Sequence, residues 1–387
     1  MKLSEYGDIY RKDLLERVVP FWLKNSLDRE CGGYFTCLDR DGSVYDTKKY
    51  IWPNGREVWM FCRLYNELEK NPEYLDAAKL GLDFLRKHVY DTQGRCFFSL
   101  QRDGQPFFYQ RKPYAAVFYM LALLEYFKAT GDESALSESM ELFHKIRAWI
   151  EDPTLIGRLA LTGWPKCSSL ADTMVVASMV IEIKDYYKED GFVAIITQAR
   201  EGIKKHYDPQ LRIFRELVPL NDEDITGHPE GRLFNPGHSI EVAWFLLHLL
   251  ELQDDPQARE MAFNVIEGSL ELGWDKEFGG LYYFMDLAGK PTLQLESSMK
   301  LWWPHTEAIY SLVLAAKLTG EKKYFYWLGK VHDYAYSHFV DKEYGEWFGY
   351  CDRRGNLTLS CKGGNYKGFF HVPRALLMCC QTIEKQK

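Results

Sequence analysis

The chain of 387 residues has no long hydrophobic run and no block of like charges. A membrane-spanning helix needs about 18 consecutive apolar residues, and the N-terminal sequence MKLSEYGDIYRKD also lacks the apolar core of a signal peptide. The net charge of −7 disfavours nucleic acids and anionic membranes as partners. We therefore expect a cytoplasmic protein that acts on a small neutral ligand.

Sequence motifs of metal, disulfide and nucleotide chemistry are absent as well. The nine cysteines are scattered and form no CxxC pair, which favours reduced thiols over a disulfide framework or a zinc site. No HxxxH or HExxH pair is present, and the glycine-rich segment from Lys362, KGGNYKG, does not match the P-loop pattern. No serine or cysteine stands beside a candidate histidine with an orienting acid, so nucleophilic catalysis has little support. We expect chemistry without a metal or a required cofactor.

The chain also has no linker rich in serine, glycine or proline, and its composition does not change along its length. With 46% hydrophobic and 15% aromatic residues it can bury a large core. Residues 1–387 are therefore expected to form a single domain.

An internal repeat is the most informative feature that is present. Each unit has an amphipathic helix, an aspartate, a glycine, an aromatic strand, a turn glycine and a second helix. In the four clearest copies the two glycines are nine or ten residues apart, a spacing typical of a short β-hairpin. These copies start at Asp28, Asp91, Asp275 and Asp341, and weaker ones start at Asp208 and Asp152. Six such units account for nearly the whole chain.

Apolar spacing and capping residues predict two helices in each unit. Their expected ranges are 5–24, 56–70, 73–89, 113–130, 132–150, 168–188, 190–206, 237–253, 255–272, 302–319, 321–339 and 371–385. The last helix reads VPRALLMCC, which is too apolar for the exposed end of an open array. We therefore predict an all-α fold, an (α/α)6 barrel of six helical hairpins with short β-hairpins at one mouth.

Candidate functional residues fall at the helix starts that ring this mouth. In RLFNPGHSIEVAW, Asn235 can cap a helix, Pro236 suits its first turn, and His238 and Glu241 share one face. The other helix starts add further polar and aromatic side chains. These are Arg56, Asp172, Trp303, His305, Glu307 and His371. The repeat thus brings residues distant in sequence to one pocket.

Their roles are expected to differ. His238 and His371 occupy equivalent first-turn positions and are the candidates for acid–base chemistry. Glu241 is expected to orient a histidine and, like Asp172, to bind substrate. Trp303 is the best candidate for a sugar platform. His305 is open between substrate binding and structure, and Arg56 could instead pair with Glu57.

Two histidines and an arginine in one pocket suit proton abstraction next to a carbonyl group. A neutral imidazole removes the proton, the cation stabilises the enolate, and an imidazolium returns a proton to the opposite face. The outcome is inversion of a carbon centre. The alternative is a glycosidase, in which Glu241 and Glu307 would act as two opposed carboxylates.

Several long segments resemble the N-acylglucosamine 2-epimerase family, also known as the renin-binding protein family. They are GGYFTCLDRDGSVYD, REVWMFCRLYNELEK, RLFNPGHSIEVAWF, GWDKEFGGLYYFMD, MKLWWPHTEA, DKEYGEWFGY and KGGNYKGFFHVPR. The resemblance implies an (α/α)6 barrel, a homodimer, and metal-free, reversible 2-epimerisation of N-acetylglucosamine and N-acetylmannosamine. It also implies that His238, His371, Arg56 and Glu307 are catalytic.

Departures from the family pattern bear on the substrate and on activation. The helix SLADTMVVASM lacks the histidine of the disaccharide epimerases and aldose–ketose isomerases. Ala115, Ala116 and Asp172 stand where closer relatives carry other residues, so a 2-epimerase or isomerase of unsubstituted mannose and glucose is the alternative. Activation by ATP, known in some members, is not expected because DPTLIGRLALTG has no lysine. A role as a protein-binding partner is the alternative from another class.

Overall fold

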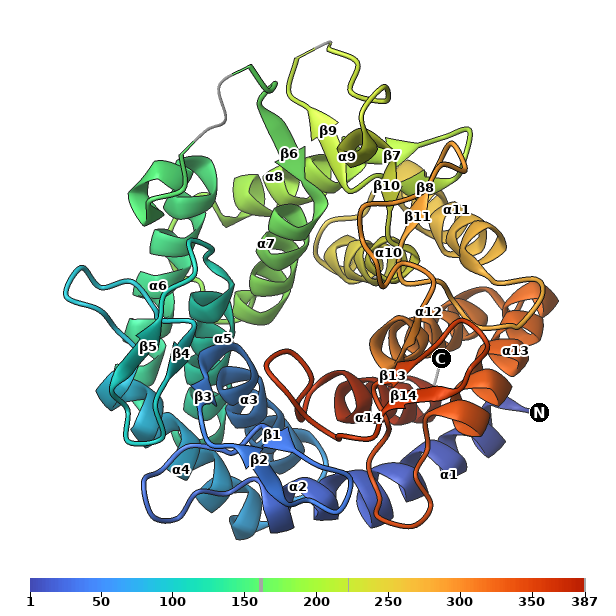
Figure 1. The fold of residues 1–387 in the computed structure, drawn as a ribbon. Helices are drawn as coiled ribbons and strands as arrows, with labels where there is room; N and C mark the ends of the chain where they lie inside the picture. Colours follow the sequence, from blue (N-terminus) through green and yellow to red (C-terminus); the bar gives the residue numbers. More distant parts are fainter. Residues whose placement is uncertain (160–162, 222, 386–387) are drawn as a thin grey trace.

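The computed structural model describes residues 1–159, 163–221 and 223–385. Within these residues the chain runs once around a ring of six inner helices, which six outer helical segments surround (Figure 1). The inner helices are α3 (Ile51–Glu67), α5 (Tyr114–Thr130), α7 (Leu170–Ile183), α10 (Pro236–Leu252), α12 (Trp302–Thr319) and α14 (His371–Glu384). The predicted (α/α)6 barrel is confirmed.

The outer helices follow the inner ones in alternation. They are α1 (Leu3–Asp13), continued by a π-helical turn (Leu14–Val18) and α2 (Val19–Asn25), then α4 (Pro72–His88), α6 (Glu133–Glu151), α8 (Phe192–Lys204), α11 (Pro256–Gly273) and α13 (Lys322–His338). An outer helix such as α4 buries one stripe with a spacing of three to four residues, whereas every residue of α12 from Trp302 to Ala316 is buried. Burial on all sides is what a helix between the barrel axis and an outer layer requires.

Two inner helices differ from the predicted ranges by five residues at one end. Helix α3 begins at Ile51 rather than at residue 56, and α7 ends at Ile183 rather than at residue 188. Pro53 is tolerated because it lies in the first turn, where no backbone N–H is needed. Gly55 permits a close approach of α5, since a Cβ atom there would lie 2.8 Å from the carbonyl group of Phe118. Pro53 and Gly55 are thus both compatible with the longer helix.

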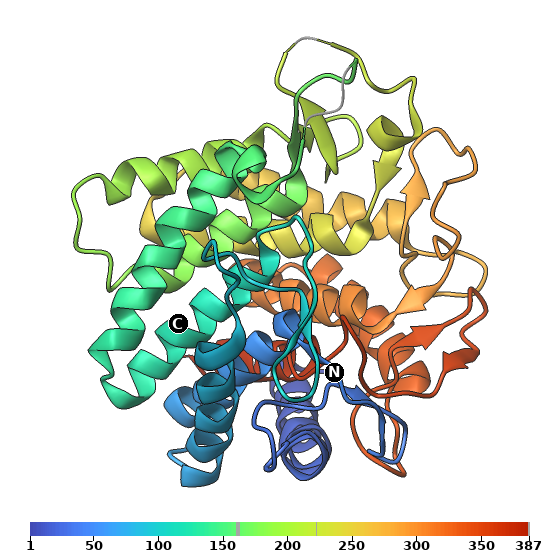
Figure 2. The ribbon, with the colours of Figure 1, turned by 60° about the vertical axis from the view of Figure 1, so that its left-hand side comes forward.

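Short antiparallel strands gather at one end of the barrel (Figure 2). The repeat hairpins include β1 (Cys37–Leu38) with β2 (Val44–Asp46), β4 (Ser99–Leu100) with β5 (Pro106–Phe108), β7 (Tyr207–Asp208) with β8 (Ile213–Phe214), and β13 (Tyr350–Cys351) with β14 (Leu357–Leu359). The turn glycines Gly42, Gly104 and Gly355 have φ near 90°, the left-handed region that glycine adopts readily. Three of the four clearest predicted hairpins are thus present, those from Asp28, Asp91 and Asp341. In the copy from Asp275 the strand pairs with a segment of the preceding unit instead.

A strand before each of four inner helices pairs with a neighbouring loop. These pairs are β3 (Lys49–Tyr50) with β4, β6 (Cys167–Ser169) with β9 (Leu217–Pro219), β10 (Leu233–Phe234) with β11 (Met285–Asp286), and β12 (Lys300–Leu301) with β13. A single helical turn, α9 (Pro229–Arg232), precedes β10. The hairpin predicted from Asp152 lies partly outside the described residues, at 160–162, and its described part begins with a 3-10 helix, Pro153–Ile156. The strand pairs fix the helix starts around the mouth.

Three of the repeat aspartates are held by buried lysines. In each case a lysine that precedes an inner helix and an arginine from another hairpin both bind the aspartate. The sets are Asp28–Lys49–Arg102, Asp275–Lys300–Arg353 and Asp341–Lys362–Arg40. The third set joins the last unit to the first, as does the hydrogen bond from Gln381 to Glu67. These contacts, and the packing of α1 against α14, close the ring (Figure 1).

Replacement of Lys300 by methionine is expected to lower the free energy of unfolding by about 3 kcal/mol, because a buried ion pair loses one partner. The Lys300 and Asp275 side chains are 0% and 1% exposed and lie 3.1 Å apart. Urea denaturation should be compared with Lys79→Met, which removes an exposed pair with Asp83. Equal losses in the two variants would contradict a stabilising role for the lysine sets.

Within the described ranges, no helix combines the length and hydrophobicity that crossing a bilayer requires.

Candidate active site

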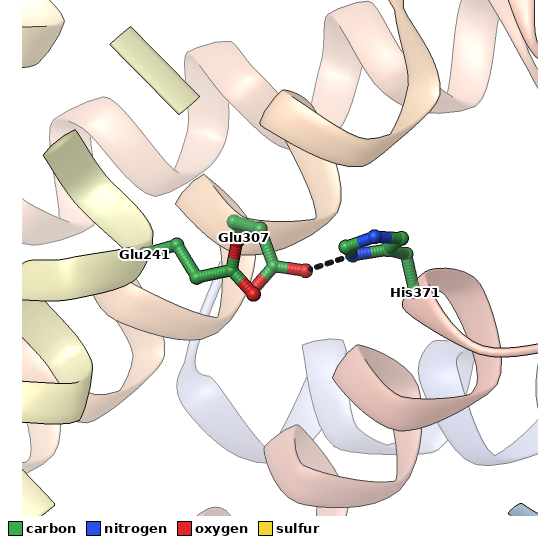
Figure 3. A group of neighbouring side chains, drawn as sticks. All are labelled: Glu241, Glu307 and His371. Carbon is green, nitrogen blue, oxygen red and sulfur yellow. Dashed lines mark hydrogen bonds and ion pairs between the residues drawn. The ribbon is translucent and has the colours of Figure 1, made fainter. Parts of the chain in front are cut away.

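The first turns of α10, α12 and α14 bring a cluster of charged side chains together inside the barrel. His371 is the first residue of α14 and is 8% exposed. Its Nδ1 atom lies 2.7 Å from Oε1 of Glu307 on α12 (Figure 3). With the Nδ1 proton donated to the carboxylate, Nε2 is the ring nitrogen left to exchange protons.

Arg374 links the two acids of this cluster. Its guanidinium donates to Oε1 of Glu307 at 2.7 Å and to Oε1 of Glu241 at 2.6 Å. Glu307 also accepts a hydrogen bond from the indole of Trp244 at 3.0 Å. Glu307 therefore orients His371. The prediction that Glu241 orients a histidine is wrong, because its carboxylate is bound by Arg374.

His238 has a carboxylate of its own. Its Nδ1 atom lies 3.1 Å from both side-chain oxygens of Glu216, in the loop that leads into β9. The helix start has the predicted geometry, since Asn235 caps α10 by accepting from the His238 N–H at 3.1 Å and Pro236 occupies the first turn. The local sequence thus presents His238 at the mouth, and the contact with Glu216 fixes its ring.

The two histidines have opposite electrostatic surroundings. Burial, aided by the charges of Arg56 and Arg374, lowers the pKa of His371 well below its ordinary value. Burial also acts to lower the pKa of His238, but the charge and hydrogen bond of Glu216 outweigh it, so this pKa is raised. At neutral pH His371 is therefore suited to act as a base and His238 as an acid.

Trp303 lies against both rings. Its ring centroid is 5.1 Å from that of His238 and 5.7 Å from that of His371. The two histidines therefore flank one indole, which is where a substrate platform was predicted. Its contact with substrate remains a prediction.

Arg56 on α3 has no acidic partner among the described residues. Its guanidinium packs over the rings of Phe118 at 4.0 Å and Phe370 at 4.4 Å. Burial and the nearby Arg374 lower the pKa of Arg56 to about 9, so it keeps its charge at neutral pH. Glu57, the alternative partner, is buried and accepts a hydrogen bond from Ser26 instead. Arg56 is thus free to bind an anionic group.

His305 does not belong to the cluster, and the prediction that it binds substrate is wrong. The side chain is 0% exposed. Its Nε2 accepts from the Leu281 N–H at 3.0 Å, and its Nδ1 donates to the Leu301 carbonyl at 2.6 Å. Its ring also stacks on Tyr334. Both nitrogens are used, so His305 anchors the hairpin loop to α12.

Asp172 lies at the start of α7, away from the hydrogen-bonded histidines. It accepts a hydrogen bond from the Tyr114 hydroxyl at 2.8 Å, and burial raises its pKa. The Tyr114 ring is 5.5 Å from that of Trp52, whose own ring lies under Arg56. Asp172 is thus connected to the site through aromatic contacts, and its binding of substrate remains a prediction.

Two alternatives based on metal or phosphate do not fit the residues present. Ligand atoms of Glu241, Glu307 and His371 lie within 4.8 Å of one another, but Arg374 already supplies a positive charge to both carboxylates. In the segment KGGNYKG both lysines are buried in ion pairs, Lys362 with Asp341 and Lys367 with Glu346. Neither group is arranged to bind an ion from solution.

Sequence reasoning missed Glu216 and Arg374. Arg374 could have been found, since it stands three residues after His371 and so shares its helical face. Glu216 carries no such signal, because it lies in a weaker copy of the repeat and reaches His238 only through the fold.

Comparison with known proteins agrees with this site and fold. A model of the family described as N-acylglucosamine 2-epimerase (GlcNAc 2-epimerase) matches residues 33–375. The N-acylglucosamine 2-epimerase of Bos taurus is 42% identical over 380 residues, which cover 95% of this chain and 89% of the bovine protein.

Solved structures share the barrel. The cellobiose 2-epimerase from Bacillus thermoamylovorans B4167 superimposes with a TM-score of 0.84 at 22% identity, covering 98% of this chain and 99% of that one. A D-mannose isomerase superimposes with a TM-score of 0.83 at 18% identity, covering 97% and 98% of the two chains. The match to the family model over residues 33–375 and the 42% identity to the bovine enzyme show that the chain belongs to the N-acylglucosamine 2-epimerase family.

Proposed function

We propose that this protein is an isomerase that interconverts N-acetylglucosamine and N-acetylmannosamine by inverting C2. The observation that carries the proposal is the pair of histidines beside Trp303. Each has its Nδ1 atom bound to a carboxylate, and its Nε2 atom bonds to no described residue and can exchange protons. Two such groups of opposite protonation preference are what a two-base inversion needs.

In the proposed mechanism the sugar ring opens and exposes the C1 aldehyde, which acidifies the proton on C2. Nε2 of the neutral His371 removes this proton, and the electron pair passes to O1 as an enolate. Nε2 of the protonated His238 then donates a proton to the opposite face of C2. In the reverse direction the two histidines exchange roles.

Glu307 and Arg374 support His371 in this mechanism. The hydrogen bond to Glu307 fixes the Nδ1–H tautomer, so that Nε2 is the basic nitrogen. The imidazolium that forms after proton abstraction is stabilised by the same carboxylate. We further propose that Trp303 serves as the sugar platform and that Asp172 binds a substrate hydroxyl or amide group.

Arg56 would stabilise the negative charge on O1. Arg56→Met is therefore expected to lower kcat by about a hundredfold or more, the scale of losing an oxyanion partner. Thermal stability should change little, because Arg56 has no carboxylate partner in the described chain and packs on aromatic rings. Initial rates and melting curves of the variant check both points. A fall in stability with unchanged kcat would remove Arg56 from the mechanism.

The N-acylated sugars are favoured over unsubstituted mannose and glucose by the comparisons. Identity to the bovine N-acylglucosamine 2-epimerase is 42%, against 22% and 18% to the cellobiose 2-epimerase and mannose isomerase structures. A glycosidase is disfavoured, because Glu241 and Glu307 share one guanidinium instead of standing opposed as two free carboxyl groups.

The proposal is tested by incubating the protein with N-acetylmannosamine and with mannose in parallel tubes and following each by NMR. Conversion of N-acetylmannosamine to N-acetylglucosamine is the expected result. Conversion of mannose alone would establish the alternative substrate. No conversion of either sugar would overturn the enzyme proposal and favour a role as a protein-binding partner.

The proposal takes the enzyme as a cytoplasmic homodimer that needs no metal and no nucleotide. The nine unpaired cysteines support a reducing compartment, and the absence of lysines from DPTLIGRLALTG supports independence of ATP. Activity that survives EDTA treatment and does not respond to added ATP is the expected result.

A further inference from the structure

Glu216 differs from Glu241 and Glu307 in that its side chain binds a histidine and no arginine. Glu307 and Glu241 are both bound to Arg374. Within the described residues, the carboxylate of Glu216 is hydrogen-bonded only to His238, and its side chain is 13% exposed. Its negative charge therefore acts on one imidazole and is not shared with a guanidinium.

The backbone around Glu216 is held from both sides. The Glu216 carbonyl accepts from the Leu170 N–H at 2.8 Å, at the start of α7, and the Arg215 N–H donates to the His206 carbonyl at 2.9 Å. The side chain of Arg215 binds Asp208. These bonds tie the residue to α7 and to the preceding hairpin, so its carboxylate is placed by rigid neighbours.

The charged groups that face His238 come from three directions. Glu216 approaches from the loop before β9, Glu241 lies one turn along α10, and His371 faces it from α14. Glu241 is neutralised by Arg374, and His371 is flanked by the cations Arg56 and Arg374. In the described part of the site, Glu216 is thus the only carboxylate beside either histidine that does not also bind an arginine.

We propose that Glu216 is a positioning residue that makes His238 the resting acid of the pair and leaves His371 as the resting base. This inference rests on the proposed function. In the free enzyme the single exchangeable proton would reside on Nε2 of His238, while Glu216 holds Nδ1. After one turnover the proton lies on His371 and returns to His238 through solvent.

A matched pair of variants tests this role. Glu216→Gln keeps the shape of the side chain and removes its charge. Glu216 lines a cavity of about 170 Å³, and the exposed Glu230 lines it too, so Glu230→Gln removes a second charge from the same cavity. The histidines are labelled with ¹⁵N, and the His238 signal is identified by its loss in His238→Asn. A pH titration of each protein by NMR then reports His238 directly and requires no turnover.

The pKa of His238 is expected to fall by about 1 in Glu216→Gln and to stay unchanged in Glu230→Gln. In the active form His238 is protonated and His371 is neutral. Above the pKa of His238 both histidines are neutral, and the form that can donate a proton is lost. The alkaline limb of kcat/KM should therefore move to lower pH in Glu216→Gln. At a fixed pH on that limb, kcat/KM of this variant should be about tenfold below that of the wild type.

An unchanged His238 titration in folded Glu216→Gln would overturn the proposal. So would a loss of activity that is equal at all pH values, because that is the mark of a purely structural role. If wild-type protein converts neither sugar but the titration moves as expected, the proposed function fails and the electrostatic role of Glu216 stands.

Discussion

Replacing His371 by asparagine is expected to lower kcat by about a hundredfold or more, the scale of removing a general acid–base group. The side chain is buried against Glu307 and Trp303, and its free Nε2 is proposed to remove the C2 proton. NMR rates with N-acetylmannosamine measure the effect. The variant should still fold, because asparagine can donate a hydrogen bond to Glu307.

His144→Asn is the matched control, since His144 is partly exposed on α6 and its side chain bonds only to Glu189 among the described residues. It should keep wild-type activity. In D2O the His371→Asn variant should also exchange the C2 proton of only one epimer, the one whose proton faces His238. Exchange of both epimers, or kcat within a few-fold of wild type, would remove His371 from the proposed mechanism.

Arg374→Met is expected to lower the free energy of unfolding by about 3–5 kcal/mol, because it leaves two carboxylates buried without their cation. Glu241 and Glu307 are 5% and 1% exposed, and Arg374 is 6% exposed. Activity should be lost as well, since Glu307 would lose the guanidinium that holds it and would no longer orient His371. Urea denaturation gives the stability difference.

The double variant Arg374→Met with Glu241→Gln separates the effect of the unpaired charges from the loss of packing by the arginine side chain, because both variants lack that side chain. Removing one of the two negative charges should recover part of the lost stability, because a single buried carboxylate retains the His371 and Trp244 hydrogen bonds. Additive losses in the double variant would show that the two acids and Arg374 do not act as one unit.

The fold could be predicted from the sequence because its signals are local. Hydrophobic spacing places the helices, and turn glycines such as Gly42 and Gly355 mark hairpins that no other residue forms as easily. Repetition then supplies the long-range information, since six equivalent units imply that their helix starts meet at one mouth. The same argument brought His238 and His371 together.

The details of the site could not be predicted because they depend on side-chain directions set by tertiary packing. His305 stands at a helix start like His238, but its ring turns into the packing between Leu281 and Tyr334. Ala115 and Ala116 follow Tyr114 on α5 and are both buried in the core, so they do not share its place beside Trp52. Glu216 reaches His238 across 22 residues of chain, a contact no local pattern encodes.

The most direct test of the central claim is the fate of the C2 proton in D2O. Wild-type protein is incubated with N-acetylmannosamine in D2O, and the N-acetylglucosamine formed is examined by ¹H NMR and mass spectrometry. Proton exchange through two histidines predicts one solvent deuterium at C2 of the product. Product that retains its C2 proton would contradict this account, because inversion would then have occurred without the enolate that His371, His238 and Arg56 are proposed to form and quench.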